Sequence, residues 1–250
     1  MVVHFVGAGP GAADLLTVRA TRLLAAADVV LFPGTYLDPE VLTHTSPHAE
    51  LIDTQDLDLD LITARLTADH QQGKEIVRLA SGDLSLYSAL FEQTRRLDAA
   101  GVPWDVTPGV PAYAAAAAEI GRELTVPLLA QSVVLTRTQA RSTAMPATEE
   151  LATFARTRST LVLHLAITRT RELMTQLEPE YGADCPVVVV HRASQPQQQV
   201  LRATVATIAD QVKTAGLRQA AVILVGRALD PQQGQESYLY DAARERSVTR

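Results

Sequence analysis

The feature that most constrains the fold is the stretch spanning residues 2–27, VVHFVGAGPGAADLLTVRATRLLAAA. It begins with a short apolar run rich in β-branched residues, which is typical of a buried strand. A glycine cluster follows at residues 7–11, and Thr17 is placed to cap a helix over Val18–Ala27. The order of strand, glycine turn and helix opens an α/β unit, whose ligand lies beyond the carboxyl end of the strand.

The glycine cluster has to be compared with the dinucleotide-binding fingerprint, which requires the spacing G-x-G-x-x-G. The glycines here fall at positions 7, 9 and 11, and Ala12 occupies the place of the third fingerprint glycine. Pro10 also removes a backbone N–H donor from the loop. The acidic residue at the expected distance is Asp28, but it precedes the second strand instead of following it. NAD binding and a connection that binds no ligand therefore remain alternatives.

Length, charge and cysteine content narrow the classes of function. A chain of 250 residues forms one large domain or two smaller ones. The formal net charge of −6 argues against a nucleic-acid partner, because phosphate binding requires a basic surface. Cys185 is the single cysteine and the six histidines are scattered, so we expect neither a disulfide nor a metal site. Without an apolar run of roughly 18 residues or a signal peptide, we expect a cytoplasmic protein that does not enter membranes.

The first half of the chain alternates predicted strands and helices, which indicates an α/β domain over residues 1–121 with a mostly parallel sheet covered on both faces. After the first strand and helix, strands are predicted at 28–32, 51–55, 75–80 and 104–107, and helices at 59–72, 88–100 and 114–118. Gly73 is expected to end the helix before it.

The second half predicts another α/β domain, over residues 122–230, with a polar tail at 231–250. Strands are predicted at 132–137, 160–165, 186–192, 199–204 and 220–226, with helices at 148–156, 168–178 and 205–215. Only a short polar loop separates the third and fourth of these strands, which favours a hairpin and hence a mixed sheet.

Three loops of the first half leave the ends of predicted strands, at Gly7–Gly11, Ser81–Tyr87 and Pro108–Tyr113. In a parallel sheet all three open on the same edge, which is where such sheets bind ligands. We therefore expect the site to include these loops.

The motifs in these loops resemble those of the S-adenosylmethionine-dependent tetrapyrrole methyltransferases. The pattern V-G-x-G-P-G-x-x-x-L-L-T is matched at residues 6–17, and P-G-V is matched at 108–110. The pattern G-D-P-x-x-Y-G is matched at Gly82, Asp83 and Tyr87, but Leu84 replaces its proline and Ser88 its last glycine. A Q-S-x-x-L-T-R segment at 131–137 matches one branch of the family, and the resemblance extends over residues 2 to about 228.

The resemblance implies the tetrapyrrole methylase fold: two α/β domains with a ligand trough between them, assembled as a homodimer. It also implies that S-adenosylmethionine is held mainly by backbone groups, which a small side chain leaves accessible. The glycine loop would face the tetrapyrrole, with Gly9 and Gly11 contacting it. The cofactor-binding residues carried over by position are Pro10, Gly82, Asp83, Leu84, Tyr87, Ala112, Leu165, Ala193 and Ala221.

The activity that the resemblance implies is C-methylation of precorrin-4, metal-free or with cobalt, at C11. Such a displacement needs no nucleophilic side chain, and Cys185 is interpreted as a buried structural thiol. A catalytic base is not identified; Tyr87 and His164 are candidates, whereas His4 is predicted to be a partnered core histidine. Guanidinium groups suit the carboxylates of a precorrin. The preferred substrate-binding arginines are Arg122 and Arg137, with Arg141, Arg169 and Arg171 also in the second half.

Three alternatives stay open. A related methyltransferase would act on another precorrin or on uroporphyrinogen III, although the second predicted strand ends in Phe32-Pro33-Gly34 without the aspartate typical of that branch. A non-catalytic module would bind S-adenosylmethionine without turnover. An NAD-dependent oxidoreductase would bind a different cofactor at the same glycine loop.

Overall fold

The computed structural model describes residues 1–138, 144–230, 232, 234 and 236–238, arranged as two units. The first unit comprises Met1–Ala116 together with Arg192–Gln198, and the second comprises Ala117–His191 and the chain from Gln199 onward. Arg141 and most of the predicted tail at 231–250 lie outside the described residues.

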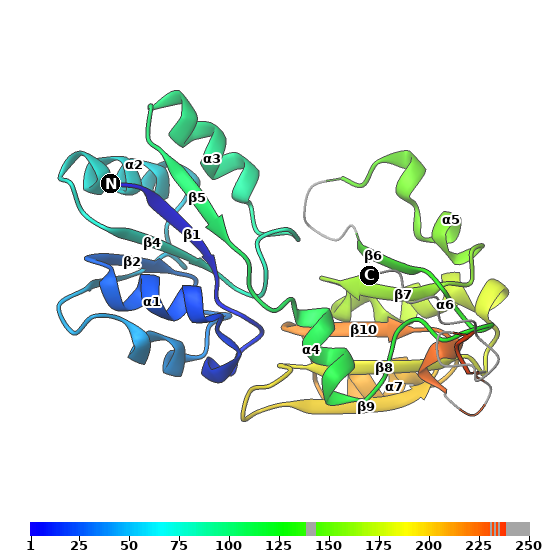
Figure 1. Cartoon of the computed structure of the whole chain (residues 1–250). Helices are drawn as coiled ribbons and strands as arrows, with labels where there is room; N and C mark the ends of the chain where they lie inside the picture. The colour runs from blue at the N-terminus through cyan, green and yellow to red at the C-terminus, as the bar shows by residue number, and fades with distance from the viewer. Residues whose placement is uncertain (139–143, 231, 233, 235, 239–250) are drawn as a thin grey trace, which may run out of the picture. The chain divides into compact units, whose positions relative to one another are not determined.

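The first unit is built on a five-stranded parallel sheet (Figure 1), as the alternating pattern predicts. Its strand order is β3-β2-β4-β1-β5, so the first strand lies between the fourth and the fifth. The strands are β1 (Val3–Gly7), β2 (Val29–Phe32), β3 (Glu50–Asp53), β4 (Ile76–Ala80) and β5 (Trp104–Thr107).

Helices cover both faces of this sheet. Val3 and Phe5 of β1 pack in one cluster with residues of α2 (Leu59–Gln71) and α3 (Leu90–Ala99). Val6 lies on the opposite face, in a cluster with residues of α1 (Val18–Ala26). This alternation follows from the two-residue period of a strand. The last helix of the unit, α4 (Ala112–Glu119), follows β5, and the division between the units falls within it.

Two predicted helix boundaries are confirmed in atomic detail. Thr17 Oγ1 accepts a hydrogen bond from Ala20 N, which satisfies one of the free N–H groups at the start of α1. Gly73, with φ +72°, follows the end of α2 in the left-handed conformation that glycine adopts without strain. The sequence analysis missed a 3₁₀ helix at Pro39–His44, although Asp38 and Pro39 form a recognisable start signal.

The second unit contains a mixed five-stranded sheet with the order β6-β7-β10-β8-β9, which confirms the prediction. Its strands are β6 (Val133–Arg137), β7 (Thr160–His164), β8 (Pro186–His191), β9 (Gln199–Thr204) and β10 (Ala221–Val225). The β6–β7 pair is parallel, whereas β10 pairs antiparallel with both β7 and β8, and β8 and β9 form the predicted hairpin.

Three helices pack against one face of the second sheet, namely α5 (Leu151–Ala155), α6 (Thr170–Tyr181) and α7 (Ile208–Thr214). Cys185 is buried in this cluster, and burial raises the pKa of its thiol to about 11. A thiol with so high a pKa is a poor nucleophile at neutral pH, so the interpretation of Cys185 as a structural residue is confirmed.

The prediction for His4 needs a correction. His4 Nδ1 lies 2.8 Å from Asp105 Oδ1, and Nε2 lies 3.7 Å from Glu75 Oε2, so the imidazole is partnered as expected. Its side chain is 17% exposed, however, and it lies at the amino end of β1 instead of in the core. One hydrogen bond to Asp105 and one longer contact with Glu75, near the amino end of the sheet, partner the ring in place of a buried network. No helix among the described residues is long and apolar enough to cross a membrane.

Candidate functional site

The three predicted loops meet at the carboxyl edge of the first sheet. They follow β1, β4 and β5, and these strands are neighbours in the sheet. Gly9 N donates to Gly82 O over 3.1 Å, and Gly82 N donates to Gly9 O over 2.7 Å. The loops therefore form a continuous hydrogen-bonded surface, as the sequence predicted from the parallel topology.

Glycines at the loop junction allow a close approach of one backbone to another. A Cβ on Gly109 would lie 2.3 Å from Gly82 O and 2.8 Å from Gly7 O, and a Cβ on Gly7 would lie 2.5 Å from Gly109 N. These neighbours are backbone atoms, so they cannot rotate away as a flexible side chain would. Gly7 and Gly109 are thus required because the loops pack backbone against backbone. The sequence suggested a different reason for small residues here, namely access of a ligand to the backbone.

Asp83 connects the second loop to the third. Its Oδ2 accepts a hydrogen bond of 2.9 Å from Gly109 N, and its Oδ1 accepts one of 2.9 Å from Ser85 N and another from the Ser85 hydroxyl. Burial alone would raise the pKa of the Asp83 carboxyl, but hydrogen bonds from Ser85, Gly109 and Leu84 outweigh it and hold the pKa below its ordinary value. Asp83 is therefore ionised at neutral pH and braces the loops.

Leu84 and Tyr87 have different environments in the second loop. The Leu84 side chain is 4% exposed and packs in the core with Phe5, which explains how the loop tolerates the loss of a proline there. Tyr87 has φ +54°, and 47% of it is exposed. A tyrosine in the left-handed region carries backbone strain, and such residues concentrate at functional sites.

The segment Arg192–Gln198, between β8 and β9, packs against the glycine loop within the first unit. Ala12 N donates to Ser194 Oγ over 3.1 Å, and Gln195 Nε2 donates to Pro10 O over 3.2 Å. Ala193 is buried beside them. The sequence analysis missed Ser194 and Gln195, because two polar residues in a loop carry no signal of a partner more than 180 positions away.

One edge of the second sheet brings together four predicted site residues. Arg137 ends β6 and pairs in register with His164, which ends β7. Leu165 follows with φ +52° and is 61% exposed. Ala221 begins β10, which runs antiparallel to β7, so it lies at the same edge of the sheet as the end of β7. Burial lowers the pKa of His164, so its imidazole is neutral at physiological pH.

The other candidate arginines have local partners. Arg122 Nε donates to Leu229 O over 3.3 Å, and its Nη1 donates to Gly121 O over 3.1 Å. Arg169 pairs with Glu172, and Arg171 pairs with Asp210. These carboxylate partners make Arg169 and Arg171 weaker candidates for binding an acidic substrate.

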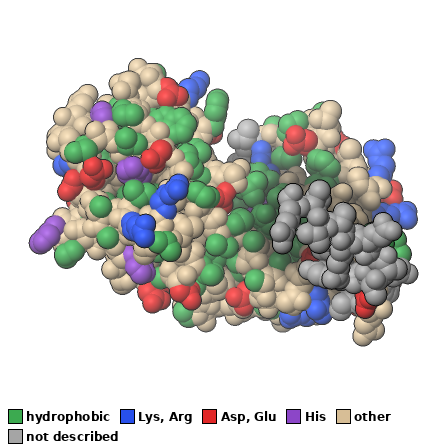
Figure 2. Space-filling model, viewed as in Figure 1, with side chains coloured by type: hydrophobic (Ala, Val, Ile, Leu, Met, Phe, Trp, Pro, Cys, Tyr) green, Lys and Arg blue, Asp and Glu red, His purple; other side chains and the backbone are tan. Residues whose placement is uncertain are grey.

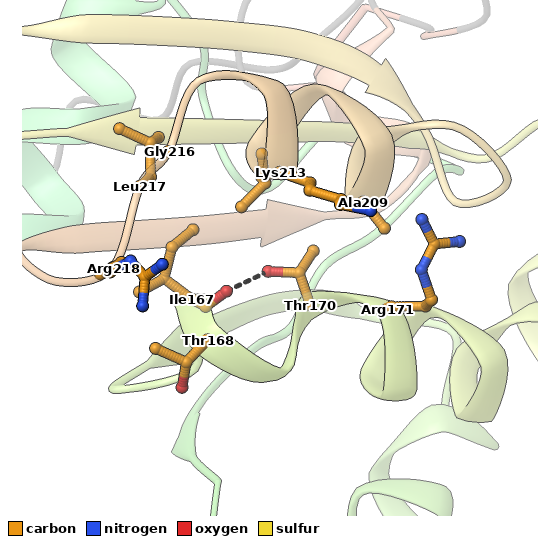
Figure 3. A pocket seen from close by; sticks show the side chains of 10 residues that line it. Ile167, Thr168, Thr170, Arg171, Ala209, Lys213, Gly216, Leu217 and Arg218 are labelled. Atoms are coloured by element: carbon orange, nitrogen blue, oxygen red, sulfur yellow. Dashed lines mark hydrogen bonds between the residues drawn. The ribbon is translucent and has the colours of Figure 1, made fainter.

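Two further features of the described residues are the charge distribution on one face of the molecule and a pocket in the second unit. Over these residues, the face in Figure 2 carries acidic and basic side chains intermixed, without a continuous basic patch. A pocket of about 290 Å³ in the second unit lies between the start of α6 and the end of α7 (Figure 3). Its cationic side chains, Arg171, Lys213 and Arg218, are exposed, and its buried Thr170 hydroxyl donates to Ile167 O. No group of three potential metal ligands is clustered in the part of the chain that the structure describes.

Comparisons with known proteins show which family this chain resembles. The model of the tetrapyrrole (corrin/porphyrin) methylases matches residues 2–209. The precorrin-4 C(11)-methyltransferase of Rhodococcus erythropolis is 51% identical over 248 residues, which cover 99% of this chain and 100% of that protein.

Two solved structures are also similar. A cobalt precorrin-4 methyltransferase of cobalamin biosynthesis has a TM-score of 0.88 and 37% identity, covering 92% of this chain and 96% of its own. The uroporphyrin-III C-methyltransferase of Thermus thermophilus, in complex with S-adenosylhomocysteine, has a TM-score of 0.77 and 28% identity, covering 95% of this chain and 97% of its own.

Proposed function

This chain belongs to the tetrapyrrole (corrin/porphyrin) methylases, and we infer that it transfers a methyl group to C11 of precorrin-4 in cobalamin biosynthesis. The observation that carries this function is the 51% identity to a precorrin-4 C(11)-methyltransferase along essentially the whole of both chains. The resemblance therefore includes both sheets and all the loops described above, and does not depend on one motif.

The methyl donor we propose is S-adenosylmethionine, which supplies a methyl group on a sulfonium sulfur. The new carbon–carbon bond forms as the sulfur–methyl bond breaks, and sulfur keeps the electron pair. The donor carries the activation, so the protein has to align donor and acceptor, and alignment can contribute on the order of 7–11 kcal/mol. No covalent intermediate with a side chain is needed, in agreement with the buried, inert Cys185.

The loop geometry supports this donor. Within the first unit, the glycine loop with Pro10 is hydrogen-bonded to the loop of Gly82 and to the segment that contains Ala193. A Cβ on Gly82 would lie 3.7 Å from Ala112 N, at the start of α4, which is an ordinary contact distance. Tyr87, in the loop after β4, and Leu165, directly after β7, both hold left-handed backbone conformations, which concentrate at functional sites. We propose that the donor is bound by Pro10, Gly82, Asp83, Leu84, Tyr87, Ala112, Leu165, Ala193 and Ala221.

The acceptor is a polycarboxylate, so a protein of net charge −6 must provide cations locally. We propose that Arg122 and Arg137 bind its carboxylates and that the glycine loop, at Gly9 and Gly11, contacts its ring. Guanidinium groups suit this role because their planar donors match a carboxylate.

A proton that the methylated ring releases needs an acceptor. Of the two candidate bases, we favour His164, because its lowered pKa leaves a neutral imidazole able to accept a proton. Tyr87 is the second candidate, since its side chain is exposed at the loops.

Relatives differ in whether their substrate contains cobalt. The relative named for precorrin-4 is 51% identical to this chain, and the solved structure named for the cobalt form is 37% identical. We propose metal-free precorrin-4 as the substrate, acted on by a cytoplasmic homodimer.

The test is a methylation assay with the purified protein, S-adenosylmethionine and, in parallel, precorrin-4, cobalt-precorrin-4 and uroporphyrinogen III. We expect precorrin-4 to gain one methyl group, detected by mass spectrometry, with the highest kcat/KM of the three substrates. Calorimetry with S-adenosylhomocysteine and with NAD identifies the cofactor. Turnover of uroporphyrinogen III alone would contradict the proposed substrate, and binding without turnover would indicate a non-catalytic module.

A further inference from the structure

The glycine loop is held by a segment that is itself rigidly constrained. Within Arg192–Gln198, Ser194 N donates to Gln198 Oε1 over 2.6 Å, and Gln195 N donates to Arg192 O over 3.0 Å. Arg192 and Ser194 have φ values of +48° and +65°. A residue that carries a side chain adopts such backbone conformations only where its surroundings impose them. The segment thus presents the Ser194 hydroxyl and the Gln195 amide in fixed positions.

Both groups bind the backbone of the glycine loop. The Ser194 hydroxyl accepts from Ala12 N, and the Gln195 amide donates to Pro10 O, so the two bonds flank Gly11 on either side. Gly9 is held by its backbone hydrogen bonds to Gly82, and Ala8 and Ala13 pack in the core. Gly11, between them, has no side chain to limit its backbone angles and needs restraint from elsewhere. The partners on Arg192–Gln198 supply that restraint.

Gly11 also fits closely against Gln195. A Cβ on Gly11 would lie 2.2 Å from Gln195 Cγ and 2.7 Å from Gln195 Nε2. The Gln195 side chain is flexible, so an alanine at position 11 would displace it, and the amide would no longer reach Pro10 O. The absence of a side chain at position 11 is therefore a condition for the bond between Gln195 and Pro10.

We propose that Gln195, assisted by Ser194, is a positioning residue for methyl transfer: it fixes the glycine loop in the conformation that receives the tetrapyrrole, and so sets the KM for that substrate. This inference rests on the proposed function, because it takes the glycine loop to contact the acceptor. Gln195 acts through the Pro10 carbonyl and takes no part in bond making or breaking.

The experiment compares Gln195→Ala, Gln195→Glu and Gly11→Ala with the double variant Gly11→Ala/Gln195→Ala. Gln195→Glu keeps the size of the side chain but replaces its N–H donor with a carboxylate that repels the Pro10 carbonyl. Gln197→Ala is the matched control, since Gln197 is an exposed glutamine of the same segment. Each variant is assayed for KM and kcat with precorrin-4, and for S-adenosylhomocysteine affinity by calorimetry.

We expect Gln195→Ala and Gln195→Glu to raise the KM for precorrin-4 by about three- to tenfold, the range that one hydrogen bond supports, with kcat and Tm nearly unchanged. In the Gly11→Ala background the bond is already broken, so adding Gln195→Ala should change KM by less than about twofold. A KM equal to that of the wild type in Gln195→Ala, or effects of the two substitutions that multiply, would overturn the proposal.

Hydrogen exchange separates failure of this inference from failure of the proposed function. In Gln195→Ala, and not in Gln197→Ala, amides of residues 8–13 should exchange several-fold faster, whichever tetrapyrrole the enzyme methylates. A wild-type enzyme that does not methylate precorrin-4 contradicts the proposed function. Unchanged exchange in Gln195→Ala contradicts the restraint on the loop.

Discussion

At the scale of single residues, the site contains side chains whose role is to hold backbone in place. One carboxylate oxygen of Asp83 accepts from Ser85 in its own loop and the other accepts from Gly109 in the next loop. Leu84 fixes the loop of Asp83 by packing in the core. His164 differs from these, because burial keeps its imidazole neutral at the end of β7. Both titratable groups give predictions that depend on pH.

Asp83→Asn should weaken S-adenosylhomocysteine binding by roughly tenfold, because an amide places an N–H where one of the loop donors now points. Since the folded protein lowers the pKa of Asp83, the stabilisation from its carboxylate is present above the ordinary pKa of an aspartate and is lost as the pH falls through the lowered value. Calorimetry measures the affinity, with the exposed Asp56→Asn as the control. Equal affinity in Asp83→Asn and the wild type would remove Asp83 from the site.

His164 should make folding sensitive to mild acid. Because its pKa is lowered in the folded state, the unfolded chain binds a proton first as the pH falls through the ordinary histidine pKa, and stability decreases from that point downward. Replacing it in His164→Gln should reduce the loss of Tm between pH 7 and pH 5. If His164 is also the base, the kcat of His164→Gln is lower than that of the wild type and no longer decreases as the pH falls. A kcat like that of the wild type would assign proton removal to another group.

At the scale of elements, the parallel sheet decides which loops become neighbours. The order β3-β2-β4-β1-β5 places β1 between β4 and β5, so the loops after these three strands share one edge. Glycines at positions 7 and 109 then let the loops approach until backbone atoms are in contact. The loop cluster is therefore a packed structure as well as the binding surface that we propose.

Gly109→Ala should lower stability by about 2–3 kcal/mol, or roughly 5–10 °C in Tm, because its Cβ would meet the Gly82 carbonyl oxygen. Gly101→Ala is the matched control: Gly101 has φ +68°, but a Cβ there meets nothing within 4 Å. Its cost should be only about 1 kcal/mol, from the left-handed backbone. Thermal unfolding compares the two variants, and a smaller effect at position 109 would contradict the close packing of the loops.

At the scale of the whole chain, the first unit is not continuous in sequence. The chain completes Met1–Ala116, builds most of the second unit, and returns with Arg192–Gln198 before β9. Ser194 and Gln195, which are far from the glycine loop in sequence, therefore form hydrogen bonds with its backbone. The family resemblance also implies a homodimer.

Light scattering on the purified protein should give about twice the chain mass of 26.9 kDa at micromolar concentration. This expectation follows from the homodimer that the resemblance implies and that we propose above. A mass equal to that of one chain across the accessible concentration range would contradict the proposed homodimer.

The sequence by itself determined the class and much of the layout of this protein. Short apolar runs rich in β-branched residues, capped helices and glycine turns predicted both sheets, and the short loop before Gln199 predicted the hairpin. The loop motifs predicted the family, because their glycines and prolines specify local backbone conformations that few other residue types can adopt. These signals are local, so they can be read along the chain.

Only the tertiary structure decided which groups those loops touch. The role of Asp83 as a brace, the packing of Gly7 against Gly109, and the restraint of the glycine loop by Gln195 depend on residues brought together by strand order. His4 shows the same limit, since its partners lie on β5 and just before β4. Such contacts join distant parts of the sequence, and no period or spacing records them, because folding fixes the distance between two residues independently of their separation along the chain.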